Sequence, residues 1–258
     1  MNYYLLHAII LFAFVNAWFI ISLITKRNDV ADIAWGLGFV LLTCVSFFMA
    51  EKNGTRGLLI LCLISIWGIR LAWHIHSRNK GKGEDYRYLA WRNQWGKWFV
   101  LRSYFQVFIL QGFFLYLIFL PVLLINKSEN TPITLLDILG LMLWILGFYF
   151  EAIGDAQLVR FKKNPHNKGK LLQEGLWSLT RHPNYFGEVI QWWGIYLIAL
   201  SVKDGWMGII GPITITFLIV KVSGIPMLEK NMAKHPDFEN YKQKTNAFIP
   251  RINFLNKN

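Results

Sequence analysis

Long apolar stretches alternate with short polar connections along the whole chain. Seven such stretches lie near residues 3–25, 30–50, 57–76, 99–125, 134–158, 185–202 and 205–225. Each is close to the roughly 20 residues that a helix needs to cross the hydrocarbon of a bilayer. The pattern therefore predicts an all-α, polytopic membrane protein with seven transmembrane helices, folded as one membrane-embedded domain over residues 1–258.

Basic residues mark one side of the expected membrane. Of the 27 Lys and Arg, 22 lie in segments 26–29, 77–102, 160–183 and 221–258, and 4 lie in the opposite connections. Because basic loops stay cytoplasmic, this predicts an outside amino terminus and a cytoplasmic carboxy terminus, in a bacterial inner membrane or the endoplasmic reticulum. The net charge of +12 is then explained by the basic residues of the cytoplasmic segments. We expect the lipid bilayer as a partner, with no nucleic acid and no obligatory protein partner.

Composition supports the same class and narrows the chemistry. Hydrophobic residues make up 54% of the chain and the mean hydropathy is +0.34, above the values of ordinary soluble domains. Cys44 and Cys62 lie inside apolar stretches without metal or redox spacing, so we interpret them as small buried side chains. The histidines lack the spacing of a metal site, and no serine-nucleophile, P-loop or Rossmann motif occurs.

Carboxylates inside the apolar stretches are the first candidates for chemistry, because a charge at membrane depth costs about 3 kcal/mol and needs a reason. Glu151 and Asp155 are four residues apart and share one face of the fifth helix. Like charges this close require a cation, a ligand or a shared proton. Arg160 and Lys162, just beyond, offer one answer. The alternative is a helix end that emerges into water.

A second polar group opens the sixth helix. The segment Arg181-His182-Pro183-Asn184-Tyr185 runs into an apolar stretch, and Asn184, Glu188 and Gln191 follow at positions i, i+4 and i+7. We expect this stripe to face the bundle interior. Pro183 suits a first helical turn, and a basic pair before a helix start favours a phosphate or carboxylate ligand. Hydrogen bonding between helices is the alternative.

Two charges in the earlier helices also need partners. Asp32 lies one turn into the second apolar stretch, and Arg70 lies near the inner end of the third. Snorkelling towards the cytoplasm explains Arg70 equally well. Gln111 adds neutral polarity to the fourth helix. The loop 78–88, which begins with Arg78, holds glycines and lysines that suit an anion, although a plain charged loop is an equally good interpretation.

These residues resemble a known family. The segment 151–250 is similar to the carboxy-terminal half of the steroid 5-alpha-reductases, membrane enzymes that reduce an enone double bond with NADPH, and most resembles their bacterial branch. The resemblance rests on Asn184 and Glu188 in an N-[YF]-x-G-E motif, on Asp155, and on Tyr241 followed by Phe248-Ile249-Pro250. Two further segments are similar: Gly83-Glu84-Asp85-Tyr86-Arg87-Tyr88 and Leu110-Gln111-Gly112.

The resemblance implies roles for particular residues. Residues 1–125 would form the substrate-pocket half and residues 134–258 the NADPH-binding half. Asp32, protonated by burial, would be catalytic and donate a hydrogen bond to the enolate oxygen. Trp35, Trp67 and Gln111 would contact a hydrophobic substrate such as a 3-oxo-4-ene steroid. The implied NADPH-binding residues are Arg70, Arg78, Glu151, Asp155, Arg160, Lys162, Arg181, His182, Asn184, Tyr185, Glu188 and Tyr241.

Two positions depart from the family pattern. Glu151 stands where the steroid enzymes often carry asparagine, and Trp67 falls near the tyrosine that helps to polarise the substrate ketone. An indole N–H can donate a hydrogen bond but does not give up a proton. Tyr104 or Tyr116 is therefore a candidate replacement for that tyrosine.

Two other functions remain open. Residues 181–187 also resemble the R-H-P-x-Y-x-G motif of isoprenylcysteine carboxyl methyltransferases, which use S-adenosylmethionine. Those enzymes tend to carry paired glutamates before a final Y-x-x-Y, whereas here a single Glu229 precedes Lys230 and a lone Tyr241. A seven-helix receptor or transporter whose polar stripes bind a ligand or an ion is the non-enzymatic alternative.

Overall fold

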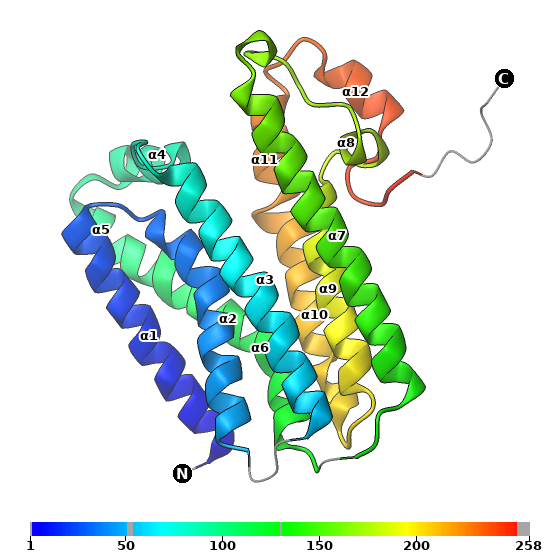
Figure 1. Cartoon of the computed structure of the whole chain (residues 1–258). Helices are drawn as coiled ribbons and strands as arrows, with labels where there is room; N and C mark the ends of the chain where they lie inside the picture. Colours follow the sequence, from blue (N-terminus) through cyan, green and yellow to red (C-terminus); the bar gives the residue numbers. More distant parts are fainter. Residues whose placement is uncertain (1, 51–53, 130, 252–258) are drawn as a thin grey trace, which may run out of the picture. The chain divides into compact units, whose positions relative to one another are not determined.

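The computed structural model describes residues 2–50, 54–129 and 131–251. All secondary structure in these ranges is helical, and no strand occurs in them (Figure 1). Six helical segments are long and apolar enough to cross a membrane: Tyr3–Thr25, Val30–Phe48, Thr55–Asn79, Tyr86–Lys127, Leu135–Lys163 and Gly205–Met232. The all-α prediction is confirmed, and these helices indicate a multi-pass membrane protein.

The sixth apolar stretch forms a shorter helix than expected. It spans Pro183–Ala199, which is 17 residues, and at 1.5 Å per residue it is about 26 Å long. It is therefore not among the six helices that qualify as membrane spans. The count of seven, and with it the orientation of the two termini, stays a prediction.

The chain divides into two compact units. The first comprises the described residues up to Thr134 together with Ala199–Ile210. Its helices are α1 (Tyr3–Thr25), α2 (Val30–Phe48), α3 (Thr55–Asn79), α4 (Tyr86–Trp95), η1 (Gly96–Trp98), α5 (Phe99–Ser103), η2 (Tyr104–Ile109), α6 (Leu110–Lys127) and η4 (Gly205–Ile209).

The second unit comprises Leu135–Ile198 and the described residues from Gly211 onwards. Its elements, two of which extend by one residue into the first unit, are α7 (Leu135–Lys163), η3 (Pro165–Asn167), α8 (Leu176–Leu179), α9 (Pro183–Ala199), α10 (Ile210–Phe217), η5 (Leu218–Val222), α11 (Ile225–Met232) and α12 (Phe238–Lys244).

Close backbone contact between α2 and α3 organises the first unit. A Cβ atom added to Gly36 would lie 2.5 Å from the carbonyl oxygen of Gly68, so the two helices touch where neither has a side chain. Large rings fill the space beside this crossing: Phe39 packs on Trp67 with ring centroids 5.4 Å apart, and both side chains are buried. The crossing fixes the start of α2, where Asp32 lies.

A glycine seam joins α7 and α9 in the second unit. Gly140, Gly147 and Gly154 recur every seven residues on α7, and Gly187 and Gly194 do so on α9. Gly140 faces Gly194 and Gly147 faces Gly187, so the helices run antiparallel (Figure 1). Small residues allow such close approach in membrane helices. The seam sets the carboxylates of α7 against the amides of α9.

Replacement of Gly147 by alanine is expected to destabilise the second unit. The new Cβ would lie 2.6 Å from the carbonyl oxygen of Gly187 and 2.7 Å from the backbone nitrogen of Gln191. Overpacking of this kind costs about 1–3 kcal/mol, and thermal unfolding of the purified protein measures it. Gly83→Ala, where no atom lies within 4 Å of the added Cβ, is the matched control. Equal midpoints for both variants would contradict the seam.

Candidate functional site

Asp32 lies at the centre of a polar cluster in the first unit. One carboxylate oxygen pairs with the Arg87 guanidinium at 2.6 Å, and the other accepts a hydrogen bond from the Tyr88 hydroxyl at 2.8 Å. Tyr88 is 5% exposed. We call Asp32, Arg87 and Tyr88 the acid–tyrosine cluster. Asp32 accepts in both contacts, and the donor role expected of a protonated Asp32 stays a prediction.

The tyrosine beside the predicted catalytic carboxylate is thus Tyr88. Neither of the expected replacements has this position: the Tyr104 hydroxyl donates to Asn16, and the Tyr116 hydroxyl donates to the backbone of Tyr4. Trp67 packs in the core against Phe39. The 56 residues that separate Tyr88 from Asp32 explain why sequence spacing did not reveal the pair.

Two more carboxylates hold the loops around this cluster. Asp29 accepts from Arg27 at 2.7 and 3.0 Å, from the Asn79 amide and from the backbone N–H of Asp85. Glu84 accepts from the backbone N–H of Asn28 at 2.6 Å and from Arg92 at 3.0 Å. Both side chains are at most 5% exposed. Buried carboxylates of this kind are stable only when paired, so each fixes the loops that contact it.

Asp85 begins α4 and orients Arg87. Its carboxylate accepts from the Arg87 backbone N–H and from the Arg87 side chain, both at 3.0 Å. Burial raises the pKa of Asp85, but the hydrogen bonds from Arg87 and its positive charge outweigh burial, so the net pKa lies below the ordinary 3.8. The carboxylate therefore holds Arg87 in place at neutral pH.

Protonation of Asp85 at acidic pH is expected to weaken its ion pair and hydrogen bonds with Arg87. Because the folded pKa of Asp85 is depressed, its stabilisation is fully present above about pH 3.8 and is lost as the pH falls through the folded pKa. Asp85→Asn should therefore be less stable than the natural chain at pH 6, and the difference should shrink below pH 4. Thermal unfolding between pH 3 and 6 tests this. Parallel curves for the two proteins would contradict it.

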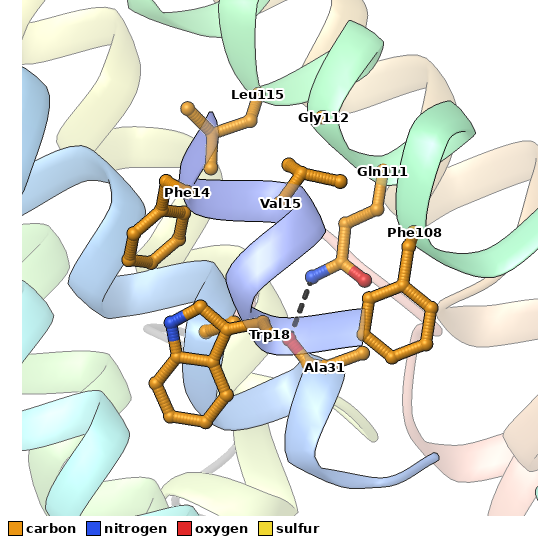
Figure 2. A pocket seen from close by; sticks show the side chains of 9 residues that line it. Phe14, Val15, Trp18, Ala31, Phe108, Gln111, Gly112 and Leu115 are labelled. Carbon is orange, nitrogen blue, oxygen red and sulfur yellow. Dashed lines mark hydrogen bonds between the residues drawn. The ribbon is translucent and has the colours of Figure 1, made fainter. Parts of the chain in front are cut away.

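A small apolar pocket is lined in part by Ala31, the residue that directly precedes Asp32 in the chain. It encloses about 260 Å³, counting its open mouth, between α1, α2 and the start of α6, as Figure 2 shows. Gln111, predicted to contact substrate, lines it and donates to the carbonyl oxygen of Ala31 at 2.8 Å. Only about 20 Å³ of this space can take the centre of a water-sized sphere, far below the roughly 300–1,000 Å³ of ordinary ligand cavities. The pocket suits a small apolar group, and substrate contact by Gln111 stays a prediction.

The other predicted residues of this unit lie in different environments. Trp35 packs edge-on against Phe39 and so joins the same aromatic core as Trp67. Arg70 lies part-buried on α3. Arg78 is exposed at the end of α3 and donates to the Asn79 side chain. Substrate contact by the tryptophans and cofactor contact by the arginines stay predictions.

A second cluster lies on the seam between α7 and α9. The Gln191 side-chain amide donates to Glu151 at 2.5 Å, and that of Asn184 donates to Asp155 at 3.2 Å. Glu151, Asp155 and Gln191 are at most 5% exposed. The prediction that the two carboxylates share one face, and that the α9 stripe faces inward, is therefore confirmed at these positions. A helix end emerging into water does not describe them.

The basic pair before α9 binds a carboxylate of the chain itself. Arg181 donates to Glu229 at 2.8 Å from Nε and 2.5 Å from Nη2, and His182 Nε2 lies 3.3 Å from the same oxygen. Arg181 also donates to the backbone carbonyl oxygens of Lys242 and Thr245. We call these contacts the carboxy-terminal clamp. Glu229 neutralises the charge of Arg181, and cofactor contact by Arg181 and His182 stays a prediction.

The closing segment of the chain completes the clamp. Thr180 donates to the carbonyl oxygens of Ala247 and Phe248, and the Phe248 ring packs edge-on against Phe186. The buried Tyr241 hydroxyl donates to the carbonyl oxygen of Trp177. Burial raises the pKa of Tyr241, which keeps the phenol neutral. The motif around Phe248-Ile249-Pro250 is thus a structural contact with the residues before α9.

The remaining predicted cofactor residues surround these clusters. Tyr185 stacks on the His182 ring with centroids 5.7 Å apart, and Glu188 is part-buried on α9. Arg160 and Lys162 are exposed at the end of α7. The role of each in binding NADPH stays a prediction.

Sequence reasoning missed Arg87 and Tyr88 as partners of Asp32, and Glu229 as the partner of Arg181, because each partner is distant in the chain from the residue that it contacts.

Comparisons with known proteins find relatives that align with nearly the whole chain and others that align with shorter segments. It is 24% identical to the uncharacterized protein C594.04c of Schizosaccharomyces pombe, over 97% of this chain and 80% of that protein. It is 37% identical to steroid 5-alpha-reductase DET2 of Arabidopsis thaliana over 73 residues, 28% of this chain and 26% of that protein. The chain thus aligns with about a quarter of that reductase.

A third relative bears on the alternative enzyme. The probable O-methyltransferase ustE of Ustilaginoidea virens is 46% identical over 46 residues, 18% of this chain and 16% of that protein. No solved structure matches.

The resemblance to steroid 5-alpha-reductases is confirmed over part of the chain, and the bacterial branch stays a prediction. The pattern of the family described as "Protein of unknown function (DUF1295)" matches residues 18–245, so the chain belongs to the DUF1295 family.

Proposed function

We propose that the protein reduces a carbon–carbon double bond conjugated to a ketone in a lipid-like substrate, of the 3-oxo-4-ene steroid class, with NADPH. The observation that carries this proposal is the buried Tyr88 hydroxyl held against Asp32 at 2.8 Å. Partial similarity to steroid 5-alpha-reductases supports an oxidoreductase of this kind. The apolar helices of the first unit support a hydrophobic substrate that arrives through the bilayer.

Enone reduction needs a donor where negative charge develops. Addition of hydride to the β carbon moves an electron pair onto the ketone oxygen, and the resulting enolate then takes a proton at the α carbon. A preorganised hydrogen-bond donor in a dry site stabilises this oxygen by about 3–4 kcal/mol. The Tyr88 O–H can turn from Asp32 to a bound ketone by rotation about its C–O bond, while Arg87 keeps Asp32 paired.

The second unit offers polar groups that suit the cofactor. Gln191 Oε1 is a buried acceptor with no hydrogen-bond partner among the residues that the structure describes, and Asn184 and Asp155 lie on the same seam. An acceptor of this kind fits the N–H groups of a carboxamide. NADPH, when bound, would supply the hydride. We assign its binding in this unit to Asn184, Asp155, Gln191 and the basic residues Arg160 and Lys162, on the cytoplasmic side.

Oxidation of NADPH by the purified protein, followed with a panel of enone lipids, tests this function. Asp32→Ala should lose turnover and still bind NADPH, because it removes the partner of Tyr88. Asn184→Ala should weaken NADPH binding, because it removes an amide of the seam. Absence of turnover with every enone, or equal activity of both variants and the natural chain, would contradict the proposal.

Methyl transfer is the second candidate, favoured by the 46% identity with the probable O-methyltransferase over 46 residues. The two functions require different cofactors. Thermal stabilisation of the purified protein by NADPH and not by S-adenosylmethionine would support reduction. The reverse result would favour methyl transfer, and stabilisation by neither would favour a binding or transport protein.

A further inference from the structure

The end of α4, together with η1 and α5 that follow it, presents an aromatic and basic surface. Tyr88 of α4 is buried against Asp32, whereas Tyr86 is 53% and Trp98, just beyond the helix, 55% exposed. Gly96, with φ of 49°, ends the helix so that η1 and α5 can turn away. Trp91 and Trp95 stack with ring centroids 5.3 Å apart.

Cations lie over these rings. The Lys97 ammonium lies 5.7 Å from the Trp98 ring centroid, and the Arg102 guanidinium lies 5.9 Å from that of Trp95. Both basic side chains are exposed. We call Trp95, Lys97, Trp98 and Arg102 the α4 surface. A cation held beside an amphipathic ring is suited to the polar boundary of a bilayer, where the ring is buried and the charge meets headgroups.

The charge of this region is not balanced within the chain. Residues 77–102 hold seven Lys and Arg but two carboxylates, Glu84 and Asp85. Those carboxylates pair with Arg92 and Arg87. Among the described residues, Lys97 and Arg102 form no ion pair with a carboxylate. Their charge is therefore available to an anion outside the chain.

We propose that the α4 surface binds the headgroups of anionic phospholipids. A free phosphate ion would use the cations but not the exposed Trp98 ring, whereas a phospholipid offers its headgroup to the cations and its acyl chains to the ring. Basic residues near a membrane attract anionic lipids, each with a several-fold effect on binding. This surface is independent of the proposed reductase activity, because Lys97, Trp98 and Arg102 lie beyond the end of α4, in η1 and α5.

The test uses the full chain in lipid nanodiscs. Small amounts of brominated phosphatidylglycerol or brominated phosphatidylcholine are added, and quenching of Trp98 is obtained as the difference between the protein and its Trp98→Phe variant. We expect stronger quenching by the anionic lipid, and we expect this preference to fall by at least severalfold in the Lys97→Gln/Arg102→Gln variant. High salt should weaken the preference in the natural chain.

A charge-matched control separates this surface from general attraction. Lys168→Gln/Lys170→Gln removes two exposed charges of the second unit and should leave the preference unchanged. The proposal is overturned by equal quenching with both lipids, by no quenching with either, or by an equal loss in the control. Displacement of the anionic lipid by inorganic phosphate at constant ionic strength would assign the site to free phosphate and also overturn it.

Discussion

Tyr88→Phe is expected to lower the rate of enone reduction by about 10²–10³-fold, the usual cost of removing one donor from a developing oxyanion. The substitution deletes only the hydroxyl and keeps the ring, which is buried beside Trp91. Asp32 keeps its ion pair with Arg87 at 2.6 Å. The loss should therefore appear in kcat, while NADPH binding and the thermal midpoint change little.

Tyr104→Phe is the matched control for this experiment. It removes a phenol of the same unit that donates to Asn16 at 3.1 Å and not to Asp32. We expect its activity to stay close to that of the natural chain. An equal loss in both variants, or full activity of Tyr88→Phe, would show that the acid–tyrosine cluster does not polarise the substrate.

Arg181→Met is expected to cost about 3–5 kcal/mol of unfolding free energy, because breaking a buried ion pair leaves its partner charge uncompensated. Arg181 is 5% exposed in its side chain and Glu229 is 20% exposed. The variant also removes donors to the carbonyl oxygens of Lys242 and Thr245. Chemical unfolding in detergent should show the loss, and the closing segment should become more sensitive to protease.

The double variant Arg181→Met/Glu229→Gln separates the clamp from a cofactor site. Removal of both charges should recover part of the stability lost in Arg181→Met, because no unpaired carboxylate remains. If Arg181 instead binds a cofactor phosphate, the single variant would keep its stability and lose affinity for NADPH. Additive losses in the double variant would also argue against the clamp.

Much of the fold follows from the sequence, because helix-forming apolar stretches are a local signal. The stretch that becomes α1 and the pairing of Glu151 with Asp155 on one face could be predicted this way. The length of α9 could not, since the helix ends at Ala199 in a turn where the Val202 backbone N–H donates to the Ala199 carbonyl oxygen. The glycines at 140, 147 and 154 show a seven-residue period in the sequence, but their partners on α9 were not predicted.

The candidate site was only partly predictable for a different reason. Its key contacts join residues that are distant along the chain: Asp32 with Tyr88, and Arg181 with Glu229. Charge and motif alone place Arg181 at a helix start, where a phosphate ligand is the natural expectation. The folded chain supplies Glu229 as the counter-ion, a partner 48 residues away that motif and charge alone do not reveal.

Transfer of deuterium from the nicotinamide to the product tests the central claim most directly. The purified protein is given an enone lipid together with NADPH deuterated at C4, in separate reactions for the two faces of the ring. The account predicts that one of the two reactions places deuterium on the β carbon of the saturated ketone. A product without deuterium from either cofactor, or a substrate that gains a methyl group from S-adenosylmethionine, would contradict it.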